Sequence, residues 1–286
     1  MRIAHIIIAH KNPQQLARLI KRMQYPDFDF YIHIDQKIDI EPFLFLKDMA
    51  GVFFIQKRIE CNWGGYSTLL AMVNSLEEAQ ESSRGYSFYN LLSAQDYPLK
   101  SNKWIHDFLL ENEGKSFIYY EEDHTSKWWD SAVQRFDRYH LTDFNFPYKF
   151  FVERVINKLL PKRKFPLAVK LYGGSKASWW MIDDECAGYL LNAFKKEKEL
   201  NSFLRFCWGT DEFVIPTILM NSPLSAKIVN GNLRYIVFPE GGASPIIYQT
   251  ADFDAIVESD MIFARKFDTT IDSVILDKID DFIDQT

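Results

Sequence analysis

Hydrophobic and polar residues alternate along the first third of the chain in blocks that predict strands and helices in turn. Residues 2–9 form an almost continuous apolar run, which is typical of a strand buried on both faces of a mostly parallel sheet. The Asn-Pro pair at 12–13 predicts a helix N-cap and first helical residue, and apolar residues follow at helical spacing to position 23. A second apolar run, 30–34, ends at Asp35. This strand–helix–strand opening predicts a right-handed crossover and a Rossmann-like nucleotide-binding half.

The alternation continues to about residue 110 and resumes after a less regular stretch. The expected further strands cover residues 52–55, 87–92, 177–182, 233–238 and 261–263. The expected helices cover 67–81 and 101–110, run from Asp183 or Asp184 to about 195, begin at Thr210 and Thr250, and include an acidic final helix. Residues 119–170 are dense in aromatic and charged side chains, which is typical of a lid or binding surface. No Gly/Ser-rich linker divides the chain, so we expect one α/β domain over residues 1–286.

Composition and charge narrow the classes of protein. With 47% hydrophobic and 25% charged residues the chain is globular, and an aromatic share of 16% is high. Its 33 Lys and Arg against 39 Asp and Glu give a net charge of −6, which argues against a nucleic-acid partner. The N-terminal run predicts a strand rather than a signal peptide, and no stretch reaches the roughly 20 apolar residues that cross a bilayer. Three cysteines without metal-ligand spacing fit a reducing cytoplasm.

Candidate chemistry lies where the strands end, because open α/β sheets bind ligands at the carboxyl edge. The first turn, residues 9–12, has no glycine, so a dinucleotide fingerprint is missing, as is a phosphate-binding P-loop motif. Asp35 follows the second strand, where its carboxylate could accept hydrogen bonds from a ribose hydroxyl or a base N–H. A turn or capping role suits it equally well. The paired glycines at 64–65 would let the backbone approach a ligand, and a tight turn explains them as well.

Acidic pairs that could hold a divalent cation occur twice, because hard cations take carboxylate oxygens. The triplet at 27–29 precedes a strand, at the wrong end of the sheet, and the triplet at 252–254 opens an expected helix. We therefore expect no metal site. Asp96, in the polar loop after the fourth strand, is favoured as a turn former on loop chemistry alone.

Two later segments carry charges whose role the spacing leaves open. Residues 210–212 read Thr-Asp-Glu at an expected helix start, where the helix N-terminus would favour an ionised carboxylate and Glu212 could act as a general base. A Thr cap with an acidic first turn fits equally. Arg265 and Lys266 follow a late strand and could bind a pyrophosphate through forked hydrogen bonds and a point charge. On an open surface they would be an ordinary solvated pair.

Seven stretches carry a family resemblance when taken in order. They are IIIAHKNPQQLARLI, YIHIDQK, NWGGYS, NLLSAQDYPLK, GGS followed by SWWMID, TDEFVIPTIL and IFARKFD, and they run almost to the end of the chain. Together they resemble the core-2/I-branching β-1,6-N-acetylglucosaminyltransferase family, glycosyltransferase family 14, which also includes the peptide xylosyltransferases. HIDQK followed by SAQDYPLK and then FARKFD is a specific combination.

The resemblance implies an inverting enzyme with a GT-A-like single domain, a Rossmann-type mixed but mostly parallel sheet flanked by helices. Residues 1–116 would form the nucleotide-binding half, and 117–286 the acceptor-binding and catalytic half. The reaction would move a sugar from a UDP-sugar to a hydroxyl without a divalent metal or other cofactor. Carried over by position, Glu212 would be the catalytic base, and Arg265 and Lys266 would neutralise the departing diphosphate. The other implied donor-binding residues are Ile8, Ala9, His10, Asp35, Gln36, Lys37, Trp63, Gly64, Ser178 and Trp179.

Acceptor binding is expected from aromatic faces and bidentate polar groups. The candidates are Asp96, Glu121, Glu122, Trp128, Trp129, Arg135 and Arg138, although any one of them could be a half-buried aromatic or a solvated charge. The expected partners are the UDP-sugar, with N-acetylglucosamine first and xylose or glucose behind it, and a glycan or glycolipid acceptor.

Departures from the family pattern shape the remaining expectations. Two extra residues between Gly174-Ser175 and Trp179-Trp180 separate this chain from its relatives, and an arginine used by animal members has no counterpart near Ser244. Animal members are disulfide-rich Golgi proteins, whereas this sequence predicts a bacterial enzyme in the cytoplasm, or peripheral at the inner face of the membrane. A catalytically inactive carbohydrate- or nucleotide-binding protein on the same fold is the alternative.

Overall fold

Twelve strands form three sheets in the computed structural model, which describes residues 1–122 and 126–285. Residues 123–125, inside the expected lid stretch, and Thr286, at the end of the expected domain, lie outside the described residues. The strands are β1 Arg2–Ala9, β2 Phe28–Ile34, β3 Val52–Phe54, β4 Tyr86–Ser93, β5 Asp96–Pro98, β6 Ser116–Ile118, β7 Glu121–Glu122, β8 Tyr172–Gly173, β9 Trp180–Asp183, β10 Ile228–Asn230, β11 Arg234–Ile236 and β12 Phe263–Arg265.

The helices alternate with these strands in the first third of the chain, as the pattern predicts. The α-helices are α1 Pro13–Arg22, α2 Tyr66–Glu81, α3 Asn102–Glu111, α4 Lys127–Ala132, α5 Gln134–Asp137, α6 Lys149–Leu159, α7 Asp184–Lys196, α8 Lys198–Leu204, α9 Val214–Met220, α10 Phe253–Val257 and α11 Val274–Gln285. Short 3₁₀ turns are η1 Glu41–Asp48, η2 Thr210–Glu212, η3 Ser225–Lys227 and η4 Thr250–Asp252. Asn12 caps α1 by accepting from the backbone N–H of Gln15, and Asp183 caps α7 by accepting from that of Cys186.

The main sheet has seven strands in the order β10-β6-β9-β4-β1-β2-β3. Strands β3, β2, β1 and β4 run parallel, β9 is antiparallel to both β4 and β6, and β10 is parallel to β6. The expected fold class, a mixed and mostly parallel α/β sheet flanked by helices, is confirmed. Strands from both expected halves of the chain build this one sheet.

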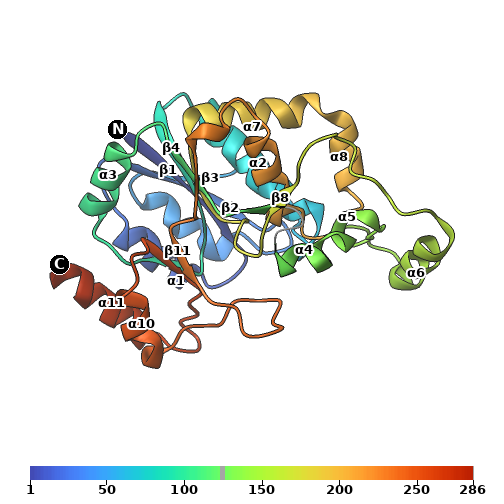
Figure 1. Ribbon diagram of the computed structural model, residues 1–286. Coiled ribbons are helices and arrows are strands. Elements are labelled where there is room, and N and C mark those ends of the chain that lie inside the picture. Colours follow the sequence, from blue (N-terminus) through green and yellow to red (C-terminus); the bar gives the residue numbers. More distant parts are fainter. Residues whose placement is uncertain (123–125, 286) are drawn as a thin grey trace.

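Helices cover both faces of the sheet, so β1 is buried on both sides. Ile3 and Ile7 belong to one apolar cluster with side chains of α1 and α11, whereas Ala4 and Ile6 belong to a second cluster with side chains of α2 and α7. Successive side chains of a strand point to opposite faces, so an uninterrupted apolar run is what two covered faces require. Figure 1 shows α2 and α7 on one side of the strands and α1 and α11 on the other.

The structure departs from the sequence pattern in the middle and at several strand ends. The less regular stretch contains three helices, α4, α5 and α6. Two of them are too short to show a period, and α6 buries no residue in the core. The loop around Asp96 is the extended strand β5, which pairs with β12 so that Asp96 lies opposite Arg265. Arg265 therefore ends a strand instead of following one, and β9 begins only at Trp180. Pairing partners far away in the sequence set these boundaries.

Candidate active site

A basic cluster, His10, Lys11, Arg265 and Lys266, lies where β1 and β12 end. Partial burial and then the charge of Lys11 lower the pKa of His10, with smaller lowering effects from Arg265 and Lys266. Burial also lowers the pKa of Lys266, followed by the charges of Arg265 and Lys11. The lowered pKa leaves His10 uncharged near neutral pH, and the three cations Lys11, Arg265 and Lys266 at one edge of the sheet form a site that favours an anion.

Arg265 is fixed in this cluster by contacts on two sides. Its Nη1 lies 2.9 Å from Asp96 Oδ1 and donates to the hydroxyl of Ser93, which itself donates to Asp96. The guanidinium carbon lies 4.1 Å from the ring centroid of Trp179, a cation–π contact. The Nε of Arg265 is buried and has no hydrogen-bond partner among the described residues. A guanidinium held in place with a spare donor is suited to an oxyanion.

The segment after Arg265 is fastened to the end of β4 and to α1. Phe267 donates its backbone N–H to the carbonyl of Gln95 at 2.8 Å, and the amide of Gln15 donates to the carbonyls of Phe267 and Ala94. Lys11 Nζ lies 2.5 Å from Asp268, whose pKa it lowers to about 2 together with Thr270. Lys11 was not among the residues expected from the sequence, although its position directly after β1 is a signal that could have found it.

The sequence left two roles open for Asp35, a turn and a ligand contact, and the structure shows the hydrogen bonds of a turn. Its Oδ1 accepts from the backbone N–H groups of Lys37 at 3.0 Å and of Cys61 at 3.3 Å. Lys37 Nζ in turn donates to the carbonyl of Cys61 and to Asn62. The backbone N–H of Asp35 donates to the carbonyl of Ala9. The ends of β1 and β2 and the start of the Asn62–Gly65 turn therefore lie together, as the donor-binding expectation requires.

Two other expected donor-binding residues of these segments, Ile8 and Gln36, make backbone hydrogen bonds to neighbouring segments. Ile8 is half-buried in β1, and its carbonyl accepts from the backbone N–H of Ala94 beyond β4. Gln36 is exposed, and its backbone N–H donates to the carbonyl of Ile59.

The turn at Asn62–Gly65 approaches protein side chains closely. Trp63 is 66% exposed and meets Trp208 edge-on at a centroid distance of 5.2 Å. Gly64 has φ +73°, and a Cβ there would lie 2.2 Å from Trp208 Nε1. The carbonyl of Gly64 accepts from Gly209 N at 2.6 Å. Gly64 is thus required by its left-handed backbone and by the packing of Trp208, and this turn abuts the segment that leads to Glu212.

We expect Gly64→Ala to lower the free energy of unfolding by about 2–4 kcal/mol, because it adds left-handed strain to a clash with the ring of Trp208. Gly85→Ala is the matched control: its φ is +71°, and nothing lies within 4 Å of the added Cβ. The control should cost only about 1 kcal/mol of strain. Urea unfolding of both variants measures the difference, and equal losses would contradict the packing argument.

Glu212 ends the 3₁₀ turn η2 and faces Arg135. Glu212 Oε2 lies 2.9 Å from Arg135 Nη1, an ion pair whose two atoms are buried and lack the alignment of a hydrogen bond. The side chain keeps 22% exposure, yet burial of its carboxyl dominates and raises the pKa of Glu212 to about 8, against the lowering effect of Arg135. The guanidinium of Arg135 also lies over the rings of Trp208 and Trp128, at 4.4 and 5.0 Å.

The expectation that the helix start favours the ionised form of Glu212 was wrong. The sequence placed it on a helix start that favours the ionised carboxylate, with Thr210 as a cap. The N-cap residue is Gly209, no side chain caps the turn, and a single 3₁₀ turn carries little dipole. Burial therefore outweighs the turn, and the pKa moves up rather than down.

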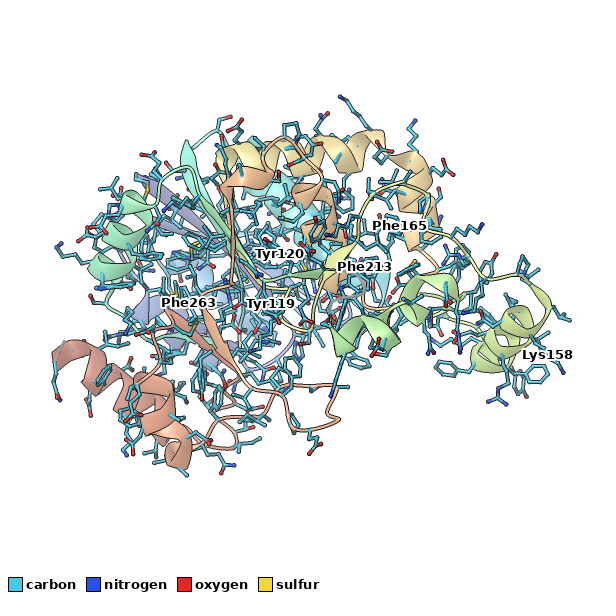
Figure 2. The ribbon with its side chains drawn as sticks, in the orientation of Figure 1. Tyr119, Tyr120, Lys158, Phe165, Phe213 and Phe263 are labelled. Carbon is cyan, nitrogen blue, oxygen red and sulfur yellow. The ribbon has the colours of Figure 1, made fainter. Side chains whose placement is uncertain are left out.

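Residues 178–179 connect the basic cluster to Glu212. Ser178 Oγ donates to Asp211 Oδ2 at 2.6 Å, next to Glu212 in sequence, while the neighbouring Trp179 lies under the guanidinium of Arg265. Figure 2 shows Phe213, which follows Glu212, and Phe263 of β12 on opposite sides of Tyr119 in this view. The two neighbouring residues thus contact the basic cluster through Trp179 and the segment of Glu212 through Ser178.

Part of the expected acceptor set surrounds Glu212. Arg135 contacts it directly, and Trp128 lies under the same guanidinium. Glu121 accepts from the hydroxyl of Tyr119 at 2.6 Å, and β7 pairs with β8 so that Glu121 lies opposite Gly173. The next residue, Gly174, donates its backbone N–H to the carbonyl of Glu212. Arg135 therefore lies at the carboxylate of Glu212, and the segment at Gly174 lies at its backbone.

Other expected acceptor residues have different surroundings. Asp96 is fully buried, and both its oxygens are occupied by Ser93 and Arg265, so it positions Arg265 and does not reach an acceptor. Trp129 is also buried and donates its indole N–H to the carbonyl of Glu121, so its ring is core. Arg138 is exposed after α5, where its carbonyl accepts from Arg163. Glu122 lies 2.6 Å from Lys170.

The two Asp-x-Asp triplets lie in positions that engage their carboxylates elsewhere. Asp29 accepts from the hydroxyl of Tyr86 at 2.6 Å and pairs with Arg2. Asp252 accepts from the backbone N–H of Gln249 at 2.8 Å in a capping box. Within residues 1–122 and 126–285, no group of three or more His, Cys, Asp or Glu side chains could hold a metal ion.

The fold and the site define a mixed α/β protein with a basic cluster at the ends of β1 and β12 and a half-buried glutamate paired with an arginine. The family pattern described as "Branch: Core-2/I-Branching enzyme" matches residues 3–261. The chain belongs to this core-2/I-branching enzyme family, a family of glycosyltransferases.

Named relatives agree with the family assignment. Xylosyltransferase 2 of Mus musculus is 26% identical over 303 residues, 98% of this chain and 33% of the relative. Xylosyltransferase oxt of Drosophila melanogaster is 25% identical over 297 residues, 94% of this chain and 32% of the relative. The chain thus spans about a third of the length of these relatives. The solved apo structure of mouse xyloside xylosyltransferase 1 overlays 92% of this chain and 97% of that one with a TM-score of 0.41 and 10% identity.

Proposed function

We propose that the chain transfers a sugar from a UDP-sugar to a hydroxyl of a glycan acceptor with inversion at the anomeric carbon. The observation that supports this proposal is that Trp179 lies under Arg265 of the basic cluster while its neighbour Ser178 donates to Asp211, the residue before Glu212. Inversion requires the leaving group and the base on opposite faces of the sugar, so the anomeric carbon is proposed to lie between the basic cluster and Glu212.

Glu212 is proposed to remove the proton from the acceptor hydroxyl as its oxygen attacks. A base is most effective when its pKa lies near the working pH, and burial raises the pKa of Glu212 to about 8. Arg135 opposes this rise, because its positive charge favours the ionised form of the carboxyl. Trp128 and Glu121, beside this pair, are proposed to orient the acceptor.

The basic cluster is proposed to stabilise the departing UDP in the role that a divalent cation plays elsewhere. Negative charge develops on the diphosphate as the glycosidic bond breaks, and fixed cations aimed at that charge lower the barrier. Burial and then repulsion by Arg265 and Lys11 lower the pKa of Lys266, and a bound diphosphate would offset that repulsion. Asp35 and Lys37, at the adjoining turn, are proposed to hold the uridine.

Two lines of support favour different donor sugars. The resemblance read from the sequence puts N-acetylglucosamine first, whereas the named relatives are xylosyltransferases at about a quarter identity. An acetamido group and a hydroxyl are told apart by pocket shape. We therefore propose a comparison of UDP-xylose, UDP-N-acetylglucosamine and UDP-glucose by release of UDP. Binding of UDP without turnover of any donor would favour a non-catalytic binding protein.

We expect UDP to raise Tm to the same extent with and without EDTA, because fixed side-chain cations rather than a metal ion would neutralise the diphosphate. Transfer should likewise proceed in EDTA. Uridine, which lacks the diphosphate, is the control and should stabilise the protein much less. Strict dependence of binding or transfer on added Mn²⁺ would contradict the role of Arg265 and Lys266.

A further inference from the structure

The helix α6 carries an exposed apolar surface at the margin of the molecule. Figure 1 shows α6 projecting at the end opposite α11, and Lys158 of this helix lies at the same extremity in Figure 2. No residue of α6 is buried. We define the α6 surface as the exposed apolar side chains on and beside this helix, which are Tyr148, Phe150, Phe151, Val155, Leu159 and Leu160.

One side of α6 is fastened to the body of the protein. Glu153 Oε2 accepts from the backbone N–H of Leu141 at 2.7 Å, and Asn157 donates to the carbonyl of Tyr139 at 2.7 Å. These two residues are four apart and so share one side of the helix.

The apolar residues occupy a different side. Phe151, Val155 and Leu159 follow each other at intervals of four and form a second stripe, with exposed fractions of 64%, 37% and 74%. Glu153 and Asn157 hold the orientation of the helix, so this stripe is presented outward.

The charge around the stripe is positive in an otherwise acidic chain. Residues 144–164 contain six Lys and Arg and one Asp or Glu, whereas the whole chain has a net charge of −6. The single acid, Glu153, is on the side that faces the body. Arg154 and Lys158 are exposed and also four apart, next to the apolar stripe. The outward side therefore combines large apolar groups with cations.

We propose that the α6 surface docks the protein on an anionic phospholipid bilayer, with its apolar side chains in the headgroup region and Arg154 and Lys158 at the phosphates. Apolar residues beside Lys and Arg on a short helix are the pattern of interfacial membrane binding. Among the described helices none is long and apolar enough to cross a membrane, so this contact is peripheral. The positive outward charge favours an anionic lipid surface over the α6 surface of a second copy, because two such surfaces would repel each other.

The test is flotation of the whole chain with vesicles of equal parts phosphatidylcholine and phosphatidylglycerol, against vesicles of phosphatidylcholine alone. The protein should float with the anionic vesicles and remain mostly free of the neutral ones. Phe151→Ser/Leu159→Ser should weaken partition by at least about tenfold, because the insertion of two large apolar groups is lost. Arg154→Gln/Lys158→Gln should weaken it by about tenfold on anionic vesicles.

Matched controls lie far from α6. Ile271→Ser/Val274→Ser removes two exposed apolar groups next to α11, and Lys195→Gln/Lys196→Gln removes two exposed charges of α7. Both should float like the parent. Equal flotation of the α6 variants and these controls, or no flotation of the parent, would overturn the proposal. So would a dimer in sedimentation analysis that only the α6 variants dissolve, since the surface would then be an interface between copies.

Discussion

Glu212→Gln is expected to lower kcat about 10²–10⁴-fold while leaving UDP affinity unchanged, because glutamine keeps the shape of the side chain and cannot accept a proton from the acceptor. The kcat/KM of the parent should rise with pH and level off above about 8, since burial raises the pKa of Glu212 to about 8 and only the ionised form can act as a base. The variant should lack this rise. Steady-state kinetics across pH with the best donor measure both effects.

Glu258→Gln, an isosteric change at an exposed glutamate after α10, is the control and should leave the rate and its pH profile unchanged. Turnover of Glu212→Gln at the rate of the parent would refute the base assignment. A loss of UDP binding in the same variant would instead indicate that the change had disturbed the fold or the donor site.

Arg265→Gln is expected to have two separable effects. It removes a cation from the diphosphate site, which should lower kcat about 10²–10³-fold. It also leaves the fully buried Asp96 without its ion-pair partner at 2.9 Å, which should cost about 3–5 kcal/mol of unfolding free energy. Urea unfolding and kinetics measure the two effects on the same preparation.

The double variant Arg265→Gln/Asp96→Asn separates the structural role of Arg265 from its chemical role. An amide at position 96 no longer buries a charge, so much of the lost stability should return while the rate stays low. Recovery of both stability and rate would show that Arg265 serves only to neutralise Asp96. Lys266→Gln offers an independent check, since it removes a neighbouring charge without exposing a buried partner.

The order of strands and helices in the first part of the chain could be predicted from local sequence signals. A continuous apolar run at 2–9 requires two covered faces, and the Asn12-Pro13 cap starts α1 where the pattern places it. The middle of the chain could not be predicted in this way. Its helices α4 and α5 are shorter than two turns and show no period, and the apolar stripe of α6 is not buried, so it could not be recognised as a core-facing helix.

The candidate site, like the fold, could be predicted only in part from the sequence. Motifs in sequence order indicated Glu212, Arg265 and Lys266, and the structure shows Glu212 paired with Arg135 and Arg265 paired with Asp96. The sequence could not show that Asp96 is buried beneath Arg265 or that Trp129 is core, because burial depends on what packs above a residue. Trp208, which packs on Gly64 and Arg135, carried no motif and was missed.

The sequence by itself determined the α/β class, the buried central strand, the family, and the positive charge at Arg265 and Lys266 in a chain of net charge −6. Only the tertiary structure decided the state of Glu212, whose pKa moves up because distant segments bury its carboxyl, with Arg135 as its partner. Periodicity and capping depend on neighbours within a few residues. Desolvation and ion pairing depend on atoms that folding alone brings together.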